Sequence, residues 1–181
     1  MKLIILDRDG VINHDSDAFI KSPDEWQPLP GSLEAIARLN KAGFRVAVVT
    51  NQSGVARGLF SLTTLAAIHA KMHALVARAG GRIDAIFFCP HGPDAQCACR
   101  KPKPGMYLEA LARFRLQAAD VWVVGDQLRD LQGAHAAGCR PVLVLTGKGQ
   151  ETMRRGDLPP GTIVRVDLGA ITAEIAAHAD G

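Results

Sequence analysis

The chain has 181 residues, 48% of them hydrophobic and 22% charged, and a formal net charge of +3 at pH 7. This length suits one domain with a buried core, so we expect residues 1–181 to form a single domain. The charge is too weak to predict a nucleic-acid partner, and no run approaches the roughly 18 apolar residues that a membrane span needs.

The first predicted element is a strand at Lys2–Leu6, an apolar run that ends in charge at Asp7. The run is too short for the core of a signal peptide, so we expect a cytoplasmic protein whose thiols stay reduced. A helix is expected at Ser32–Ala42, with Ser32 as its N-cap and Gly43 as its stop. Strands and helices then alternate, with strands expected at Phe44–Val49, Ala85–Phe88, Val121–Val124, Pro141–Leu145 and Thr162–Val166, and helices at Leu62–Ala79, Met106–Phe114, Leu128–Ala137 and Ala170–Ala177.

Strands that are apolar throughout and separated by helices indicate an α/β fold with a doubly wound, mainly parallel sheet, covered on both faces. In such sheets, ligands bind beyond the carboxyl ends of the strands. Polar residues gather after those ends: Asp7 and Asp9 follow the first strand, Thr50 the second, and Asp126 the fourth. We therefore expect the functional site at this edge.

These residue types suit phosphoryl transfer. Asp7 can attack phosphorus as a nucleophile, and Asp9 can exchange protons with the leaving alcohol and with water. Asp7 and Asp126 offer the hard oxygen ligands that Mg²⁺ prefers. Thr50 can donate a hydrogen bond to a phosphoryl oxygen, and Lys101 can neutralise the charge that develops there.

A cysteine-rich stretch, "CPHGPDAQCACRKPKPG", begins at the end of the third strand. It holds four soft ligands at the spacing of a closed, structural Zn²⁺ site. The ligands are Cys89, His91, Cys97 and Cys99. With four protein ligands no coordination position is open, so we expect the zinc to shape the loop and hold Arg100 and Lys101 at the rim of the site.

Four segments, "DRDGVIN", "TNQSGVARG", "CRKPKPGM" and "VGDQLRD", resemble in order the four motifs of the haloacid dehalogenase-like (HAD) phosphatases. The cysteine loop is similar to that of one branch of this family, the heptose 1,7-bisphosphate phosphatases, which are related to histidinol-phosphatases. The resemblance implies a Rossmann-like fold, and a backbone carbonyl of Asp9 on Mg²⁺ beside Asp7 and Asp126. It also implies a set of substrate-binding residues: Arg8, Asn51, Gln52, Ser53 and Arg100.

The resemblance further implies the reaction and its partner. The partner is a sugar phosphate, D-glycero-D-manno-heptose 1,7-bisphosphate, whose 7-phosphate is hydrolysed through an aspartyl phosphate to give heptose 1-phosphate, for ADP-heptose and lipopolysaccharide core biosynthesis. The segments after the first motif and the third strand are too short for a cap domain, and a monomer is expected without one. Many relatives carry a lysine directly after the fourth-motif aspartate, where this chain has Gln127.

Two alternatives remain open from the sequence. Histidinol phosphate is a second candidate substrate, since Asp15, Asp17 and Asp24 could meet a cationic group. A zinc-ribbon binding module would explain the cysteines, but it would not explain aspartates at two strand ends. No residue pattern distinguishes the two anomers of the heptose.

Several other polar residues have a structural interpretation. Cys139 is expected as a buried core thiol. His69 and His73, one helical turn apart, are expected on the surface of their helix. Asp130 is interpreted either as a charge on a helix face or as a partner of the metal ligands. Residues 117–120 are expected to be a plain connection.

Overall fold

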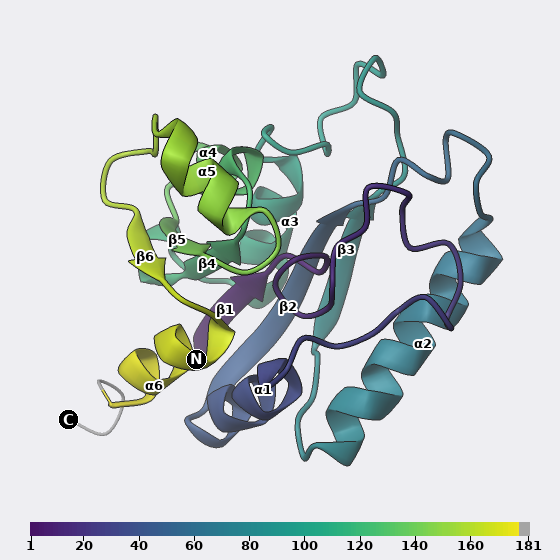
Figure 1. Ribbon diagram of the computed structural model, residues 1–181. Helices are drawn as coiled ribbons and strands as arrows, with labels where there is room; N and C mark the ends of the chain where they lie inside the picture. Colours follow the sequence, from purple (N-terminus) through teal and green to yellow (C-terminus); the bar gives the residue numbers. More distant parts are fainter. Residues whose placement is uncertain (178–181) are drawn as a thin grey trace.

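The computed structural model describes residues 1–177, in which six parallel strands form one sheet in the order β3-β2-β1-β4-β5-β6 (Figure 1). The strands are β1 (Lys2–Leu6), β2 (Phe44–Asn51), β3 (Ala85–Cys89), β4 (Trp122–Gly125), β5 (Arg140–Val144) and β6 (Ile163–Arg165). The chain builds outward from β1 to β3, then returns to the other side of β1 for β4. This confirms the predicted doubly wound parallel sheet, and it places the reversal of strand order between β1 and β4.

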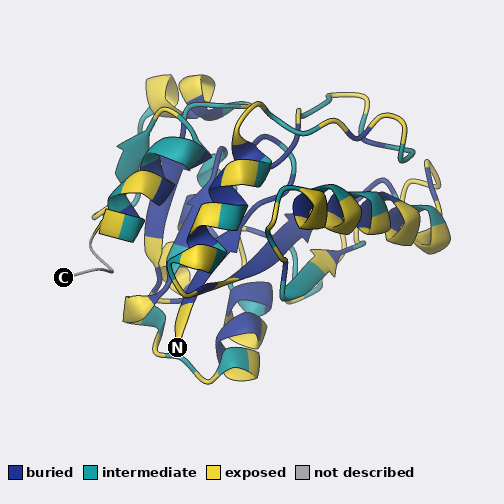
Figure 2. Cartoon of the chain, turned by 90° about the horizontal axis from the view of Figure 1, so that it is seen from below, coloured by how far each residue is buried: buried dark blue, intermediate teal, exposed yellow. Residues whose placement is uncertain are grey.

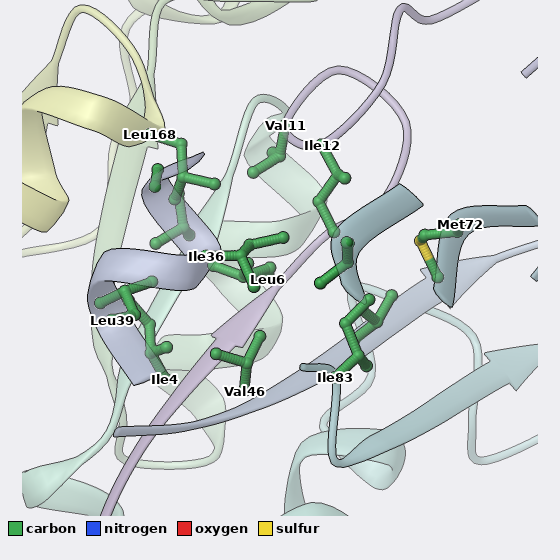
Figure 3. Close-up of a cluster of buried hydrophobic side chains, with 14 of the residues drawn as sticks. Ile4, Leu6, Val11, Ile12, Ile36, Leu39, Val46, Met72, Ile83 and Leu168 are labelled. Carbon is green, nitrogen blue, oxygen red and sulfur yellow. The ribbon is translucent and has the colours of Figure 1, made fainter. Parts of the chain in front are cut away.

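Each face of the sheet has its own hydrophobic core because successive side chains of a strand point to opposite faces. In β1, Ile4 and Leu6 join one core, and Leu3 and Ile5 join the other. The helices that contribute to the cores are α1 (Ser32–Lys41), α2 (Leu62–Arg78), α3 (Gly105–Phe114), α4 (Leu128–Ala136) and α6 (Leu168–Ala177). The first core contains side chains of α1, α2 and α6, and the second contains those of α3 and α4. Figure 3 shows part of the first core, and Figure 2 shows the buried strands between helices whose outer faces are exposed.

Three local predictions were wrong. No helix was predicted at α5 (Gly149–Arg155), and a connection was predicted where a short 3-10 helix, η1 (Ala118–Asp120), forms. The N-cap of α1 is Gly31, at φ 77°, instead of Ser32. The hydroxyl of Ser32 donates to the carbonyl oxygen of Ile12 at 2.6 Å, so it ties the helix to the loop after β1.

Both places where a cap domain was considered hold loops in the part of the chain that the structure describes. Residues 7–31 connect β1 to α1 and fold back over the sheet, where Val11, Ile12 and Trp26 join the first core. Residues 90–104 connect β3 to α3. The fold without a cap domain is therefore confirmed. Among the helices within residues 1–177, none combines the length and apolar character that crossing a membrane requires.

Candidate active site

Four ionisable side chains gather at the carboxyl ends of β1 and β4. Oδ1 of Asp7, which follows β1, lies 3.0 Å from Nζ of Lys101. The same Nζ lies 2.8 Å from Oδ1 of Asp130, in the first turn of α4, and donates to the carbonyl oxygen of Val49 at 3.0 Å. Asp126 follows β4, and each of the three aspartates offers a carboxylate oxygen within 4.8 Å of those of the others. Three buried acidic groups lie together, and the ammonium group of Lys101 pairs with only two of them, so this cluster favours an additional cation.

The shared burial of these groups changes their proton affinity. Burial and the charge of Asp130 raise the pKa of Asp7 to about 7, against the opposing charge of Lys101. Burial and the charges of Asp130 and Asp7 raise the pKa of Asp126 to about 8. Burial lowers the pKa of Lys101, but the charges of Asp130 and Asp7 outweigh it and hold that pKa above its usual value. A bound cation would displace protons from these carboxyl groups.

The geometry around Asp126 fits a hard metal ion. Its Oδ2 accepts a hydrogen bond from the backbone N–H of Lys148 at 2.8 Å, whereas its Oδ1 is buried without a hydrogen-bond partner. The backbone of Gly10 and Gly147 approaches this carboxylate so closely that a Cβ on either residue would lie 2.1 Å or 2.3 Å from Oδ2. A buried carboxylate oxygen without a donor, facing a second carboxylate, is the ligand type that Mg²⁺ prefers. Asp7 and Asp126 therefore fit the predicted magnesium site.

Asp9 is held by three side chains. Arg8 binds both of its oxygens, from Nε to Oδ1 at 3.0 Å and from Nη2 to Oδ2 at 3.1 Å. Asn13 donates to Oδ1 at 2.8 Å and Gln52 to Oδ2 at 3.0 Å. Burial raises the pKa of Asp9, but the charge of Arg8 and these hydrogen bonds outweigh it, so the pKa lies below its usual value. The carboxylate is ionised at neutral pH and firmly oriented.

A cavity of about 240 Å³ opens above these groups. Its lining includes Asp7, Asp9 and the second-motif residues Thr50, Asn51, Gln52 and Ser53. The outer part of the lining, whose residues are half-buried or exposed, carries four cations and two carboxylates. The cations are Arg57, Arg100, Arg129 and Lys148, and the carboxylates are Asp15 and Asp17. An anionic inner cluster and a cationic outer part suit a phosphorylated ligand that enters with a metal ion.

The four predicted zinc ligands lie together in the loop after β3. Sγ of Cys89 lies 3.1 Å from Sγ of Cys99 and 3.8 Å from Sγ of Cys97, and Nδ1 of His91 lies 3.3 Å from Sγ of Cys99. A tetrahedral Zn²⁺ with Zn–S bonds of about 2.3 Å holds its sulfur ligands about 3.8 Å apart. The cluster therefore fits Zn²⁺ with little rearrangement.

The cysteine loop is also tied to the cavity. The backbone N–H of Gln52 donates to the carbonyl oxygen of Cys89 at 2.7 Å, and that of Ala56 donates to Pro90 at 3.2 Å. Arg100, which lines the cavity, donates from Nη1 to the carbonyl oxygen of His91 at 3.3 Å. The ligand cluster therefore supports residues on both sides of the cavity.

The structure places two predicted residues differently from what the sequence suggested. Arg8, expected to bind substrate, is fully buried, and its side chain contacts Asp9 and His69. His69, expected on the helix surface, is buried, and its Nε2 lies 3.2 Å from Nη1 of Arg8. His73 is exposed and Cys139 is buried, both as predicted.

Some residues at the site were not recognised in the sequence. Asn13 holds Asp9, and Arg129 lines the cavity; neither residue type is diagnostic by itself. Asp130 was interpreted either as a charge on a helix face or as a partner of the metal ligands. The structure supports the second interpretation, because Asp130 is buried and pairs with Lys101. Gln127 is the N-cap of α4 and forms a reciprocal capping box with Asp130. For His69 a signal existed, because its position falls on the apolar stripe of α2.

A family model described as "HAD-hyrolase-like" matches residues 98–170. The chain is 60% identical, over 179 residues, to D-glycero-beta-D-manno-heptose-1,7-bisphosphate 7-phosphatase of Bordetella bronchiseptica, covering 99% of this chain and 100% of the relative. It is 55% identical to the Pseudomonas putida protein of the same name, covering 97% of this chain and 99% of the relative.

Solved structures of phosphatases from the same branch are also similar to the chain. The chain is similar to the crystal structure of D,D-heptose 1,7-bisphosphate phosphatase from B. bronchiseptica complexed with magnesium and phosphate, with a TM-score of 0.97 and coverage of 98% of this chain and 99% of that one. The phosphatase of the same name from Burkholderia thailandensis is 53% identical, with a TM-score of 0.78 and coverage of 97% and 98%. These similarities extend over nearly the whole chain.

Proposed function

Because the chain belongs to the HAD-like phosphatases, in the branch of the heptose 1,7-bisphosphate phosphatases, we propose that it removes the 7-phosphate of D-glycero-β-D-manno-heptose 1,7-bisphosphate. One observation carries this proposal: Asp7, Lys101 and Asp126 meet beneath a cavity whose outer lining is cationic. The heptose 1-phosphate product would supply ADP-heptose and lipopolysaccharide core synthesis. The β anomer is proposed because both curated relatives are named for it.

The reaction takes two steps at Asp7. A carboxylate oxygen of Asp7 attacks the phosphorus of the 7-phosphate, the bond from phosphorus to the sugar oxygen breaks, and Asp9 gives a proton to the departing alkoxide. Water then attacks the aspartyl phosphate, Asp9 takes the proton of that water, and inorganic phosphate leaves. Acting as an acid in the first step requires Asp9 to take up a proton in exchange for one of its four hydrogen bonds.

The surrounding side chains would stabilise the charge of the transferred group. Lys101 lies against Asp7, and Thr50 lines the cavity, so both can reach phosphoryl oxygens. Mg²⁺, held by Asp7, Asp126 and the backbone carbonyl of Asp9, would supply the positive charge that the acidic cluster lacks. The B. bronchiseptica relative, solved with magnesium and phosphate, supports this assignment.

The outer part of the cavity favours a bisphosphate over histidinol phosphate. Its four cations outnumber its two carboxylates. Lys148 Nζ lies 2.7 Å from Asp17 and 3.7 Å from Asp15, so these acidic groups already have a cationic partner. A second phosphate would find Arg57, Arg100 and Arg129 around it, and Arg100 is the residue we assign to substrate recognition.

We also propose that one chain is a single domain and a complete catalytic unit, and that it works in the cytoplasm. All six strands form one continuous sheet, which supports a single domain, and the monomer stays an expectation from the fold without a cap domain. Cys89, Cys97 and Cys99 lie together without a disulfide, which supports a compartment that keeps thiols reduced. In this proposal Zn²⁺ is structural, and it holds the loop that carries Arg100.

The test is a comparison of kcat/KM among four substrates with Mg²⁺: both anomers of the 1,7-bisphosphate, heptose 7-phosphate and histidinol phosphate. We expect the β-bisphosphate to be best, and heptose 7-phosphate to be slower by on the order of a hundredfold, because it forgoes charge-assisted contacts worth about 3 kcal/mol. ³¹P NMR of the product should show that the anomeric phosphate is retained. Faster turnover of histidinol phosphate, or loss of the 1-phosphate, would refute the assignment.

A further inference from the structure

His69 connects α2 to the reacting end of the sheet. The helix packs on the first core through Ile68, Met72 and Val76, and His69 lies on the same buried stripe with 8% of its surface exposed. Its Nε2 lies 3.2 Å from Nη1 of Arg8. A histidine that reaches from a packed helix to the loop after β1 spans 61 positions of the chain. The contact is therefore a tertiary one, between two segments that are each held by other packing.

Arg8 has no exposed surface, so the nitrogens of its guanidinium group depend on acceptors within the protein. Nε and Nη2 form a fork on the two oxygens of Asp9, and Nη1 faces His69. Because a guanidinium group is a donor at every nitrogen, His69 must be the acceptor, with Nε2 unprotonated. Burial and the adjacent Arg8 charge lower the pKa of His69 to about 3, which agrees with a neutral ring.

We propose that His69 is a positioning residue for Asp9, which it orients through the guanidinium group of Arg8. This inference rests on the acid/base role proposed for Asp9. The planar guanidinium transmits orientation: an acceptor at Nη1 fixes the plane, and the plane fixes both oxygens of the carboxylate. Asn13 and Gln52 then hold the sides of the carboxylate, so the Asp9–Arg8–His69 chain determines its angle toward the cavity.

Replacing His69 with leucine would leave a buried N–H of Arg8 without an acceptor, and we expect the fork on Asp9 to tilt. The loss then depends on how much the leaving group needs a proton. For heptose bisphosphate, an alkyl phosphate, kcat/KM should fall by roughly ten- to a hundredfold. For p-nitrophenyl phosphate, whose leaving group departs without a proton, it should fall by less than about threefold. The value of kcat/KM depends on the steps up to and including the departure of the leaving group, so it reports on the first chemical step.

Four variants complete the experiment. His69→Gln supplies an amide oxygen as acceptor and should restore most of the activity on the alkyl phosphate. Arg8→Lys, which cannot form the fork, should reproduce the leaving-group dependence of His69→Leu even if that variant folds poorly. Asp9→Asn gives the reference dependence for loss of the acid itself. His73→Leu, exposed one turn further along α2, should behave like wild type. Melting temperatures show which variants are folded.

The positioning role would be overturned if folded His69→Leu and Arg8→Lys lost kcat/KM equally on both substrates, or lost none on either. The acid/base role of Asp9 would be unaffected by that result. If kcat/KM of Asp9→Asn fell equally on both substrates, the acid role of Asp9 would be refuted, and the positioning role of His69 would be refuted with it. If wild type rejects the heptose bisphosphate, any alkyl phosphate that it does accept can replace that substrate. The failure of the proposed substrate is thus distinguishable from the failure of the proposed role of His69.

Discussion

Asp7, Asp126 and Asp130 carry more negative charge into the interior than Lys101 can neutralise. The pKa of Asp7 rises to about 7 and that of Asp126 to about 8, both chiefly through burial. The ordinary value is 3.8, so the folded, metal-free protein binds protons that the unfolded chain releases. A metal ion and these protons compete for the same oxygens.

This competition predicts how stability depends on pH. A carboxyl group whose pKa is higher in the folded state than in the unfolded state adds to the free energy of unfolding at low pH. For Asp7 and Asp126 this contribution is fully present below the unfolded pKa of 3.8, and it is lost as the pH rises through about 7 to 8. The Tm of the metal-free protein should therefore fall between pH 5 and pH 8. Added Mg²⁺ should raise the Tm more at pH 8 than at pH 5, by roughly several degrees. Differential scanning fluorimetry measures both effects.

Asp126→Asn, which stays neutral at every pH, should flatten this pH dependence and weaken the Mg²⁺ effect. Asp120→Asn, at an exposed position in η1, serves as the matched control and should behave like wild type. A Mg²⁺ effect of the same size at both pH values would contradict the proposed competition.

At this scale the sequence predicted the residues that directly follow a strand. Asp7 and Asp126 do so, and a residue at that position must lie at the edge of a parallel sheet. Lys101 comes twelve residues after β3, and it was predicted because the cysteine loop leads from that strand into Arg100 and Lys101. The direction of Arg8 could not be predicted, because it depends on the acceptor that α2 brings to it.

Among the helices and strands, those with an apolar period were predicted closely and α5 was missed. The sequence of α5, GQETMRR, is short and mostly polar, so it lacks the periodic apolar residues from which a helix is predicted. Its role is nonetheless close to the site: Thr152 donates through its hydroxyl to the carbonyl oxygen of Asp126 at 2.8 Å. Strand β2 extends two residues beyond its prediction, so Thr50 and Asn51 are held by the ladder with β3 and have more fixed positions than turn residues.

The cysteine loop gives a prediction for a single segment. Cys97→Ser leaves an incomplete tetrahedron, and we expect loss of zinc and a looser loop. Because Arg100 bonds to His91 and Gln52 bonds to Cys89, the loosening should reach the outer cavity. The kcat/KM for the heptose bisphosphate should fall by on the order of ten- to a hundredfold, and that for p-nitrophenyl phosphate by less, since only the former depends on Arg100.

Zinc content by elemental analysis accompanies the kinetics. Cys139→Ala, a buried thiol distant in sequence from the loop, is the control and should retain zinc and both activities. Wild-type protein without zinc, or a zinc-free Cys97→Ser protein with both activities intact, would show that the loop needs no metal.

For the whole molecule, the class of fold followed from the sequence but the order of its strands did not. All the inner strands are apolar on both faces, so periodicity alone cannot say which are neighbours. The order matters because it places β1 beside β4 and brings Asp7 and Asp126 together. This adjacency, together with the loop that returns Lys101 to Asp7, turns four separate motifs into one site.

The most direct test of this site is to trap the phosphoenzyme. Asp9→Asn lacks the base of the second step, so it should accumulate phosphate on Asp7 when it reacts with a good leaving group and Mg²⁺. Rapid acid quench, proteolysis and mass spectrometry should locate that phosphate on the carboxylate of Asp7, and Asp7→Asn should show neither phosphoenzyme nor turnover. Phosphate on another residue, or near-normal turnover by Asp7→Asn, would contradict the proposed mechanism.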